Sequence, residues 1–251
     1  GNMKPLVFGS AARYLAGFLL FSLSLGLAAL LMMPAASAVY TRPAVILAEH
    51  PPVIVIDAGH GGEDGGASGS DGTLEKDLNL LVADSVAEIL AAAGYDVRRT
   101  RSDDRLLYDL YGELSDYTGH KKTYDLRNRL RFTREANAAL LVSIHMNKFP
   151  DARYHGLQVY YSAAQPLSQA VAGNIQSYTK RYLQPDNTRE IKRATSAIYL
   201  LHRCEIPAVM VECGFLSNEA ELAQLKDATY RLTLALTIAC AVAESLQAAA
   251  Q

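Results

Sequence analysis

Residues 53–62 read VIVIDAGHGG, and this stretch decides how the chain around it is interpreted. Four β-branched residues in a row, directly after Pro51-Pro52, are typical of a buried β-strand. The glycines that follow let the backbone turn sharply and approach a bound atom closely. Open α/β sheets bind ligands beyond the carboxyl ends of their strands. His60 is therefore a candidate ligand-binding residue at the end of the first strand of such a sheet.

A second predicted strand, LLVSI at residues 140–144, runs into His145, and Glu75 follows His60 by fifteen residues. Taken singly, each histidine is more often structural than ligating, and an acidic residue in the first turn of a helix ordinarily complements the helix dipole. Together, two histidines and one carboxylate are the protein ligands of a hydrolytic zinc site that keeps one position open. Their spacing is not that of the helix-borne H-E-x-x-H motif.

Glu212 stands in another apolar segment, AVMVECGF at residues 208–215. A carboxylate inside such a strand is costly unless something pairs with it. One interpretation is a buried ion pair with Arg129 or Arg203, and the other is a general base beside the metal site. Burial would raise the pKa of Glu212 and a nearby cation would lower it, so the sequence leaves both roles open.

The N-terminal region predicts export. Lys4 and Arg13 precede an apolar run at residues 14–33, and Ala36-Ser37-Ala38 fits a cleavage site, so residues 1–38 are expected to be a signal peptide. The alternative is an uncleaved membrane anchor through residues 14–33, which are numerous enough to span a bilayer. Residues 39–52 are expected to be a linker, and residues 53–251 a single catalytic domain.

Composition narrows the class of protein. The chain has 251 residues with 24 basic and 26 acidic side chains, and no basic patch that would favour nucleic acid. Its three cysteines form neither a disulfide framework nor a metal-binding C-x-x-C pair. Cys240 lies on an apolar helical face and is expected in the core.

Periodicity predicts the remaining elements. Residues 101–124 carry four tyrosines without a regular pattern, and a segment of this length usually has a function or is disordered. We expect it to form part of a substrate groove, although a mobile surface loop is an open alternative. Together, the elements expected from the sequence predict a three-layer αβα sandwich around a mixed sheet of about six strands. Helices are predicted over residues 76–93, 125–138, 165–183, 219–226 and 229–246, further strands over 95–100 and 156–162, and an element of uncertain type over 198–201.

The chain resembles the zinc-dependent N-acetylmuramoyl-L-alanine amidases, which cut the stem peptide from bacterial peptidoglycan. Four ordered blocks carry the resemblance, at residues 56–67, 74–80, 143–147 and 211–218. The resemblance implies that His60, Glu75 and His145 hold one zinc ion and that Glu212 is the catalytic carboxylate. Asn147 and Arg129 are weaker candidates for substrate contacts, with packing roles equally open.

Within this family the chain most resembles the spore-cortex, germination-specific amidases, through Arg99-Thr100-Arg101, the long segment before residues 125–129 and its overall size. This implies a role in spore cortex maturation, as the first step towards muramic δ-lactam, and in germination. It also implies action in the cell wall or the spore intermembrane space, and a possible lipoprotein activator. Cys213 departs from the family pattern, since a small residue such as Thr or Val usually stands there.

Two other functions fit part of the pattern. A zinc carboxypeptidase or aminopeptidase acting on wall peptides also uses two histidines and two carboxylates, but needs a site for a free peptide terminus that the sequence does not reveal. A non-catalytic wall-binding module is disfavoured because all four catalytic positions are occupied by suitable residues.

Overall fold

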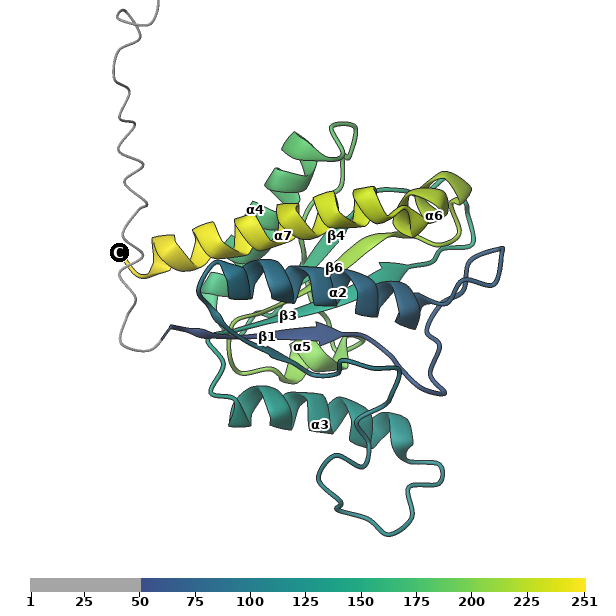
Figure 1. Cartoon of the computed structure of the whole chain (residues 1–251), viewed down its shortest axis with the longest axis vertical. Coiled ribbons are helices and arrows are strands. Elements are labelled where there is room, and N and C mark those ends of the chain that lie inside the picture. Colours follow the sequence, from purple (N-terminus) through teal and green to yellow (C-terminus); the bar gives the residue numbers. More distant parts are fainter. Residues whose placement is uncertain (1–50) are drawn as a thin grey trace, which may run out of the picture. The chain divides into compact units, whose positions relative to one another are not determined.

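The computed structural model describes residues 51–251, drawn in colour in Figure 1. The signal peptide or membrane anchor predicted for residues 1–38, and all but the last two residues of the predicted linker, lie outside this part of the chain. Everything said of the structure below concerns residues 51–251.

One mixed sheet forms the middle layer, with the strand order β2-β1-β3-β6-β4-β5. Neighbouring strands run parallel except β4, which is antiparallel to β6. The mixed six-stranded sheet expected from the sequence is thus confirmed. The strands are β1 (Val53–Ala58), β2 (Asp96–Arg99), β3 (Leu140–Asn147), β4 (Gln158–Tyr161), β5 (Lys192–Arg193) and β6 (Ala208–Phe215).

Helices cover both faces of this sheet, so the three-layer αβα sandwich is confirmed (Figure 1). Helices α2, α4 and α7 cover one face, and α3 with the short α5 covers the other. The helices are α2 (Glu75–Ala92), α3 (Lys121–Glu135), α4 (Pro166–Tyr182), α5 (Tyr199–Arg203), α6 (Glu219–Lys226) and α7 (Ala228–Ala249).

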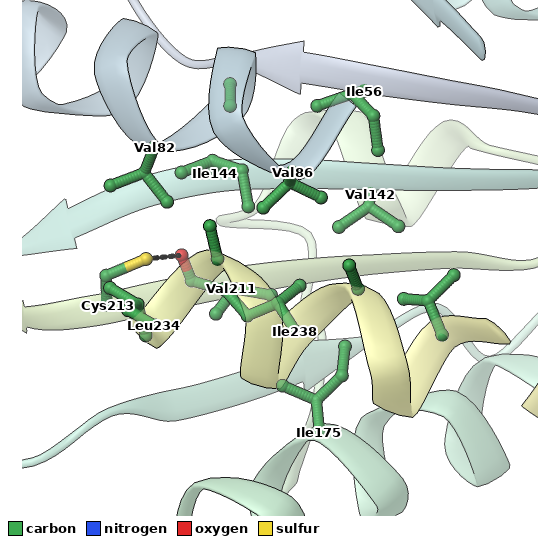
Figure 2. Packing of buried hydrophobic residues seen from close by; sticks show 14 of the residues in the cluster. Ile56, Val82, Val86, Val142, Ile144, Ile175, Val211, Cys213, Leu234 and Ile238 are labelled. Carbon is green, nitrogen blue, oxygen red and sulfur yellow. Dashed lines mark hydrogen bonds between the residues drawn. The ribbon is translucent and has the colours of Figure 1, made fainter. Parts of the chain in front are cut away.

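The larger core lies between the sheet and α2, α4 and α7. Alternate strand residues point into it because successive side chains in a strand face opposite sides of the sheet. Val82 and Val86 of α2 lie among these strand residues in Figure 2. The other side chains labelled there, all buried, are Ile56, Val142, Ile144, Val211, Ile175, Cys213, Leu234 and Ile238.

Two cysteines contrast in this layer. Cys213 is fully buried, and its thiol lies 3.7 Å from the carbonyl oxygen of Val211 (Figure 2). Burial raises the pKa of this thiol well above its usual value, so Cys213 acts as a small apolar core residue. The expectation of a core position for Cys240 is wrong, because Cys240 is exposed.

Cys240 is exposed because of the composition of α7. Within residues 51–251, α7 is the helix that is long and apolar enough to cross a membrane, judged by length and composition alone. Its apolar residues surround the helix, so periodicity does not single out one buried side. Ile238 and Val242 are fully buried, whereas Leu232 and Leu236 are 51% and 43% exposed. Cys240 continues their spacing of four residues and therefore faces outward.

The start of α3 also differs from the prediction. The helix begins at Lys121 rather than Asp125, so the irregular segment ends at residue 120. No side chain caps the first turn. Instead, Tyr124 stacks edge-to-face on Tyr117 with ring centroids 5.2 Å apart, a tertiary contact that the sequence pattern does not reveal.

Candidate metal centre

His60, Glu75 and His145 meet at the carboxyl edge of the sheet. One ligand atom from each lies within 4.8 Å of the other two. Glu75 Oε1 is 2.9 Å from His145 Nδ1 and 3.3 Å from His60 Nε2. The three residues come from the end of β1, the first residue of α2 and the end of β3, so three separate sequence blocks converge on one point.

Two glycines make room for this convergence. A side-chain carbon on Gly59 would lie 2.2 Å from the Cε1 and Nε2 atoms of His145. A side-chain carbon on Gly66 would lie 2.5 Å from Glu75 Oε2 and 2.8 Å from His60 Cδ2. His60 itself has a φ of 60°, a conformation uncommon for a residue with a side chain. The Gly-rich turn thus lets the three side chains approach one another.

Glu75 is held as a carboxylate. Its Oε2 accepts a hydrogen bond from the backbone N–H of Ala67 at 2.8 Å, and its Oε1 accepts one from Met146 at 3.1 Å. Burial alone would raise the pKa of Glu75, but the hydrogen bonds from His145 and His60 outweigh it and hold the pKa far below its usual value. A charged, rigid carboxylate suits metal binding.

The donor set fits a zinc ion. Two imidazole nitrogens and one carboxylate oxygen are typical of hydrolytic zinc sites. His60 Nδ1 lies 2.9 Å from Asp64 Oδ2, without the alignment of a hydrogen bond, so a carboxylate stands beside the ring as it commonly does for metal-binding histidines. His60, Glu75 and His145 would hold the ion.

Glu212 lies next to this cluster. In the β3–β6 register, His145 and Glu212 are direct partners. The Oε2 atom of Glu212 is buried and has no hydrogen-bond partner within residues 51–251. Desolvation raises the pKa of Glu212 to about 7, with the histidines lowering it and Glu75 adding to the increase. In this part of the chain neither Arg129 nor Arg203 forms an ion pair with Glu212, so the structural ion pair considered above is absent here.

Arg129 is instead committed to a buried network behind the centre. Its guanidinium forms ion pairs with Asp57 at 2.6 Å and Asp125 at 2.9 Å, and all three residues are at most 3% exposed. Its remaining contacts are hydrogen bonds to the carbonyl oxygens of Ala58 and His60, at 2.8 and 2.7 Å. Of the two roles that the sequence leaves open for Arg129, these contacts favour packing.

The profile of the N-acetylmuramoyl-L-alanine amidases matches residues 54–244, which is most of the chain. The chain belongs to this family. The amidase is 37% identical to the germination-specific N-acetylmuramoyl-L-alanine amidase of Bacillus subtilis, over 74% of this chain and 76% of that protein. It is also 32% identical to the N-acetylmuramoyl-L-alanine amidase LytC of the same organism, over 71% of this chain but 32% of LytC.

A solved relative extends the likeness to the fold. The CwlD amidase of Clostridioides difficile, whose structure is a complex with the GerS lipoprotein, superposes with a TM-score of 0.73 and 38% identity. The match covers 78% of this chain and 99% of that one. The family resemblance and the α/β fold expected from the sequence are therefore confirmed.

One hollow adjoins the candidate metal centre of the amidase, and another lies beside the Gly-rich turn. One, of about 210 Å³, lies between the two histidines and α5, where Ile198, Tyr199 and Met210 form an apolar wall. The other, of about 500 Å³, lies beyond the Gly-rich turn and is lined by Gly62, Tyr108 and Lys121 among others. Residues of the tyrosine-rich segment and of the turn that carries His60 line this second hollow together.

Asn147 is half-buried at the end of β3. Its side-chain oxygen accepts a hydrogen bond from the backbone N–H of Lys148 at 2.8 Å, and its carbonyl accepts one from Leu216 at 2.8 Å. These contacts hold the strand end. A substrate contact by Asn147 remains a prediction.

Sequence reasoning missed the residues that hold the Gly-rich turn from behind. Arg101 donates hydrogen bonds to the carbonyl oxygens of Ala58 and Gly59, at 2.9 and 3.0 Å. Asn79 donates to the carbonyl oxygen of Gly59 at 3.1 Å, from a buried helix face that is apolar apart from Glu75. Two features of the sequence could have indicated these supporting residues. One is the asparagine on the buried face of the helix, and the other is Asp57 within a β-branched strand.

Proposed function

We propose that this amidase is zinc-dependent and hydrolyses the amide between the lactyl group of N-acetylmuramic acid and the L-alanine of the stem peptide. One observation carries the proposal: Glu212, with an unpartnered buried oxygen, stands in register beside His145 of the His60–Glu75–His145 cluster. A zinc site with three protein ligands and a neighbouring carboxylate is suited to amide hydrolysis.

The bound ion would supply Lewis-acid polarisation of the scissile carbonyl and a more acidic water. Glu212 takes a proton from the attacking water as general base, and the water oxygen bonds to the carbonyl carbon. Glu212 then returns that proton to the alanine nitrogen as the C–N bond breaks. The products are a muramic acid carboxylate and a peptide with a free amino terminus. Burial, which raises the pKa of Glu212, favours its taking up the proton of the water.

Ala67, Met146 and Arg129 support this chemistry from a distance. Backbone N–H groups of the first two fix the Glu75 carboxylate, and Arg129 holds the carbonyl oxygen of His60. These contacts keep the ligands in place before any substrate binds, which is the general requirement for an efficient site.

The biological role we propose is in spore cortex maturation and germination. The germination-specific relative supports it by its name and its 37% identity. Cleavage here would be the first step towards muramic δ-lactam, completed by a separate deacetylase. The solved complex of the CwlD amidase with GerS supports a lipoprotein partner for this chain as well. Such a role requires action outside the cytoplasm, reached through the signal peptide or anchor predicted in residues 1–38.

We also propose that the tyrosine-rich segment forms one wall of the substrate groove. Tyr108 stacks on Tyr117 with centroids 5.1 Å apart, and Lys121 lies over the Tyr108 ring at 5.1 Å. Tyr108 and Lys121 of this group line the hollow of about 500 Å³ beside the Gly-rich turn. Long segments on a rigid scaffold often carry binding.

Digestion of purified peptidoglycan tests the proposed reaction. With added zinc, the protein should release intact stem peptides that begin with L-alanine, detected by mass analysis. A zinc carboxypeptidase or aminopeptidase would leave shortened peptides on the glycan instead. Absence of any released peptide, with binding to the wall retained, would identify a wall-binding module.

A further inference from the structure

Arg189 is a cation without an acidic partner at the edge of the sheet that carries the metal centre. Its Nε donates to the carbonyl oxygen of His155 at 2.6 Å, and its Nη1 donates to Gln158 Oε1 at 3.1 Å. No ion pair to Arg189 occurs within residues 51–251. A guanidinium has five N–H donors, so several of them, including both on Nη2, lack an acceptor in this part of the chain.

Aromatic rings hold the Arg189 guanidinium flat. Its central carbon lies 4.4 Å from the centroid of the Phe215 ring and 5.6 Å from that of Tyr154. Tyr154 stacks in turn on Phe149, with centroids 4.4 Å apart. The side chains of Tyr154 and Phe149 are 45% and 44% exposed, whereas Phe215 is buried. The result is a rigid cation bordered by an open aromatic surface.

A β-bulge in β6 places Phe215, which contacts Arg189, on the same face of the sheet as His145 and Glu212. The pairing advances from His145–Glu212 to Asn147–Phe215, so β6 uses one extra residue there. Without that residue Phe215 would face the opposite side, because side chains alternate along a strand. Glu221 fixes the arrangement by accepting hydrogen bonds from the backbone N–H groups of Phe215 and Gly156, each at 2.8 Å.

Gln158 links Arg189 to the catalytic carboxylate. In the antiparallel β4–β6 pair, Gln158 lies directly opposite Glu212. Directly opposite residues place their side chains on one face, with Cβ atoms about 5 Å apart. His145, Glu212 and Gln158 therefore form a row across three strands. The Gln158 side chain accepts the hydrogen bond from Arg189 at the end of that row.

We propose that Arg189 binds a carboxylate of the stem peptide and thereby sets the preference of the enzyme for peptides with free carboxylates. The inference rests on the proposed function, which brings a peptide bearing carboxylates to this edge of the sheet. A planar guanidinium with its geometry fixed and its donors free is suited to a carboxylate, which accepts two parallel hydrogen bonds from it. Phe149 and Tyr154 form the surface along which the peptide lies.

Arg189 also has a structural role, because it links the carbonyl oxygen of His155 to the side chain of Gln158. The experiment therefore has to separate peptide binding from this structural role. The probes are two synthetic muramoyl peptides that differ only in whether the stem carboxylates are free or converted to carboxamides. The proteins are the zinc-loaded wild type, Arg189→Gln and Arg181→Gln. Arg181 provides the matched control because its guanidinium also lies over a tyrosine ring, Tyr182 at 5.1 Å, but on the exposed side of α4.

The wild type should favour the free-carboxylate probe in kcat/KM by roughly tenfold, the usual size of one charged hydrogen-bonding contact. Arg189→Gln should lose that preference through a higher KM for the free-carboxylate probe, with a much smaller change in kcat/KM on the carboxamide probe. Arg181→Gln should behave as the wild type. No preference in the wild type, or an equal loss on both probes in Arg189→Gln, would overturn the proposal.

Binding of the free stem peptide, measured by calorimetry without turnover, separates this inference from the reaction itself. Arg189→Gln should bind the free-carboxylate peptide roughly tenfold more weakly than the wild type does. If neither probe is hydrolysed but this difference in affinity is found, the subsite stands and the proposed reaction fails. Equal affinities would overturn the subsite even if the enzyme hydrolyses both probes.

Discussion

His145 of β3 and Glu212 of β6 are direct partners in a parallel pair of strands at the centre of the sheet. This relationship places a candidate metal ligand and a candidate general base side by side. It also separates their roles, because His145 contacts Glu75 while the Oε2 atom of Glu212 contacts no hydrogen-bonding group in residues 51–251. The predictions below follow from this arrangement and from the groups that hold it.

Removing a ligand should remove the metal. His145→Ala deletes one of three protein ligands and should lose bound zinc together with activity, measured by metal analysis after dialysis. His202→Ala is the control, since this exposed histidine at α5 is not in the cluster and should leave zinc content unchanged. Full zinc occupancy in His145→Ala would reject His145 as a ligand.

Gly59→Ala should disturb the centre without touching a ligand. The added methyl group would lie 2.2 Å from the His145 ring, so the imidazole has to move. We expect weaker zinc binding in competition with a chelator. Gly173→Ala on α4, where an added methyl group meets nothing within 4 Å, serves as control. Equal zinc affinity in both variants would mean that the contact between Gly59 and His145 does not position the ligand.

Arg129→Met should destabilise the whole domain. It leaves the buried carboxylates of Asp57 and Asp125 without their partner, and breaking a buried ion pair costs about 3–5 kcal/mol. Chemical denaturation measures this loss as a lower midpoint. Arg131→Met is the comparison, because Arg131 pairs with Glu113 and Glu135 on the surface and its removal should cost about 1 kcal/mol or less. Similar losses in both variants would contradict a special role for the buried network.

Acid should weaken the fold through Asp57. Burial tends to raise its pKa, but Arg129, Ser143 and Thr100 together lower it from 3.8 to about 2. A depressed carboxyl pKa contributes stability that is present above pH 3.8 and lost as the pH falls through about 2. The contribution is on the order of 2 kcal/mol. Asp57→Asn cannot titrate, so its free energy of unfolding should fall less steeply over this range than that of the wild type. Parallel curves would contradict the assignment.

Replacing residues 109–116 by a short Gly-Ser linker tests the groove. This part of the tyrosine-rich segment is mostly exposed, so the domain should keep its melting temperature. If residues 109–116 extend the wall formed by Tyr108 and Lys121, KM on peptidoglycan should rise while kcat changes little. Unchanged kinetics would show that residues 109–116 are a surface loop outside the groove.

Much of the site was predictable because its residues follow strong local patterns. The β-branched runs of β1 and β3 and the apolar run of β6 mark buried strands, and each leads to His60, His145 or Glu212. The amphipathic α2 places Glu75 at its start. Each of these signals spans only a few neighbouring residues and needs no knowledge of tertiary structure.

What could not be predicted depends on pairing between distant segments. The sequence allowed Arg129 to pair with Glu212, but the fold pairs it with Asp57 and Asp125. The strand β5 consists of two exposed charged residues and has no apolar signature. The face on which Phe215 meets Arg189 depends on a bulge in β6, and a shift of register by one residue leaves no mark in the sequence.

The central claim is that Glu212 is the general base beside a zinc site, and one variant tests it most directly. Glu212→Gln keeps the shape of the side chain but cannot accept a proton, so a general base should lose about 10²–10⁴-fold in kcat. Zinc content, melting temperature and peptidoglycan turnover are measured on the same preparation, with Glu75→Gln alongside as the variant that should lose zinc. The account predicts a folded, zinc-loaded Glu212→Gln protein with turnover reduced at least a hundredfold. A folded, zinc-loaded protein with near-normal turnover would contradict it.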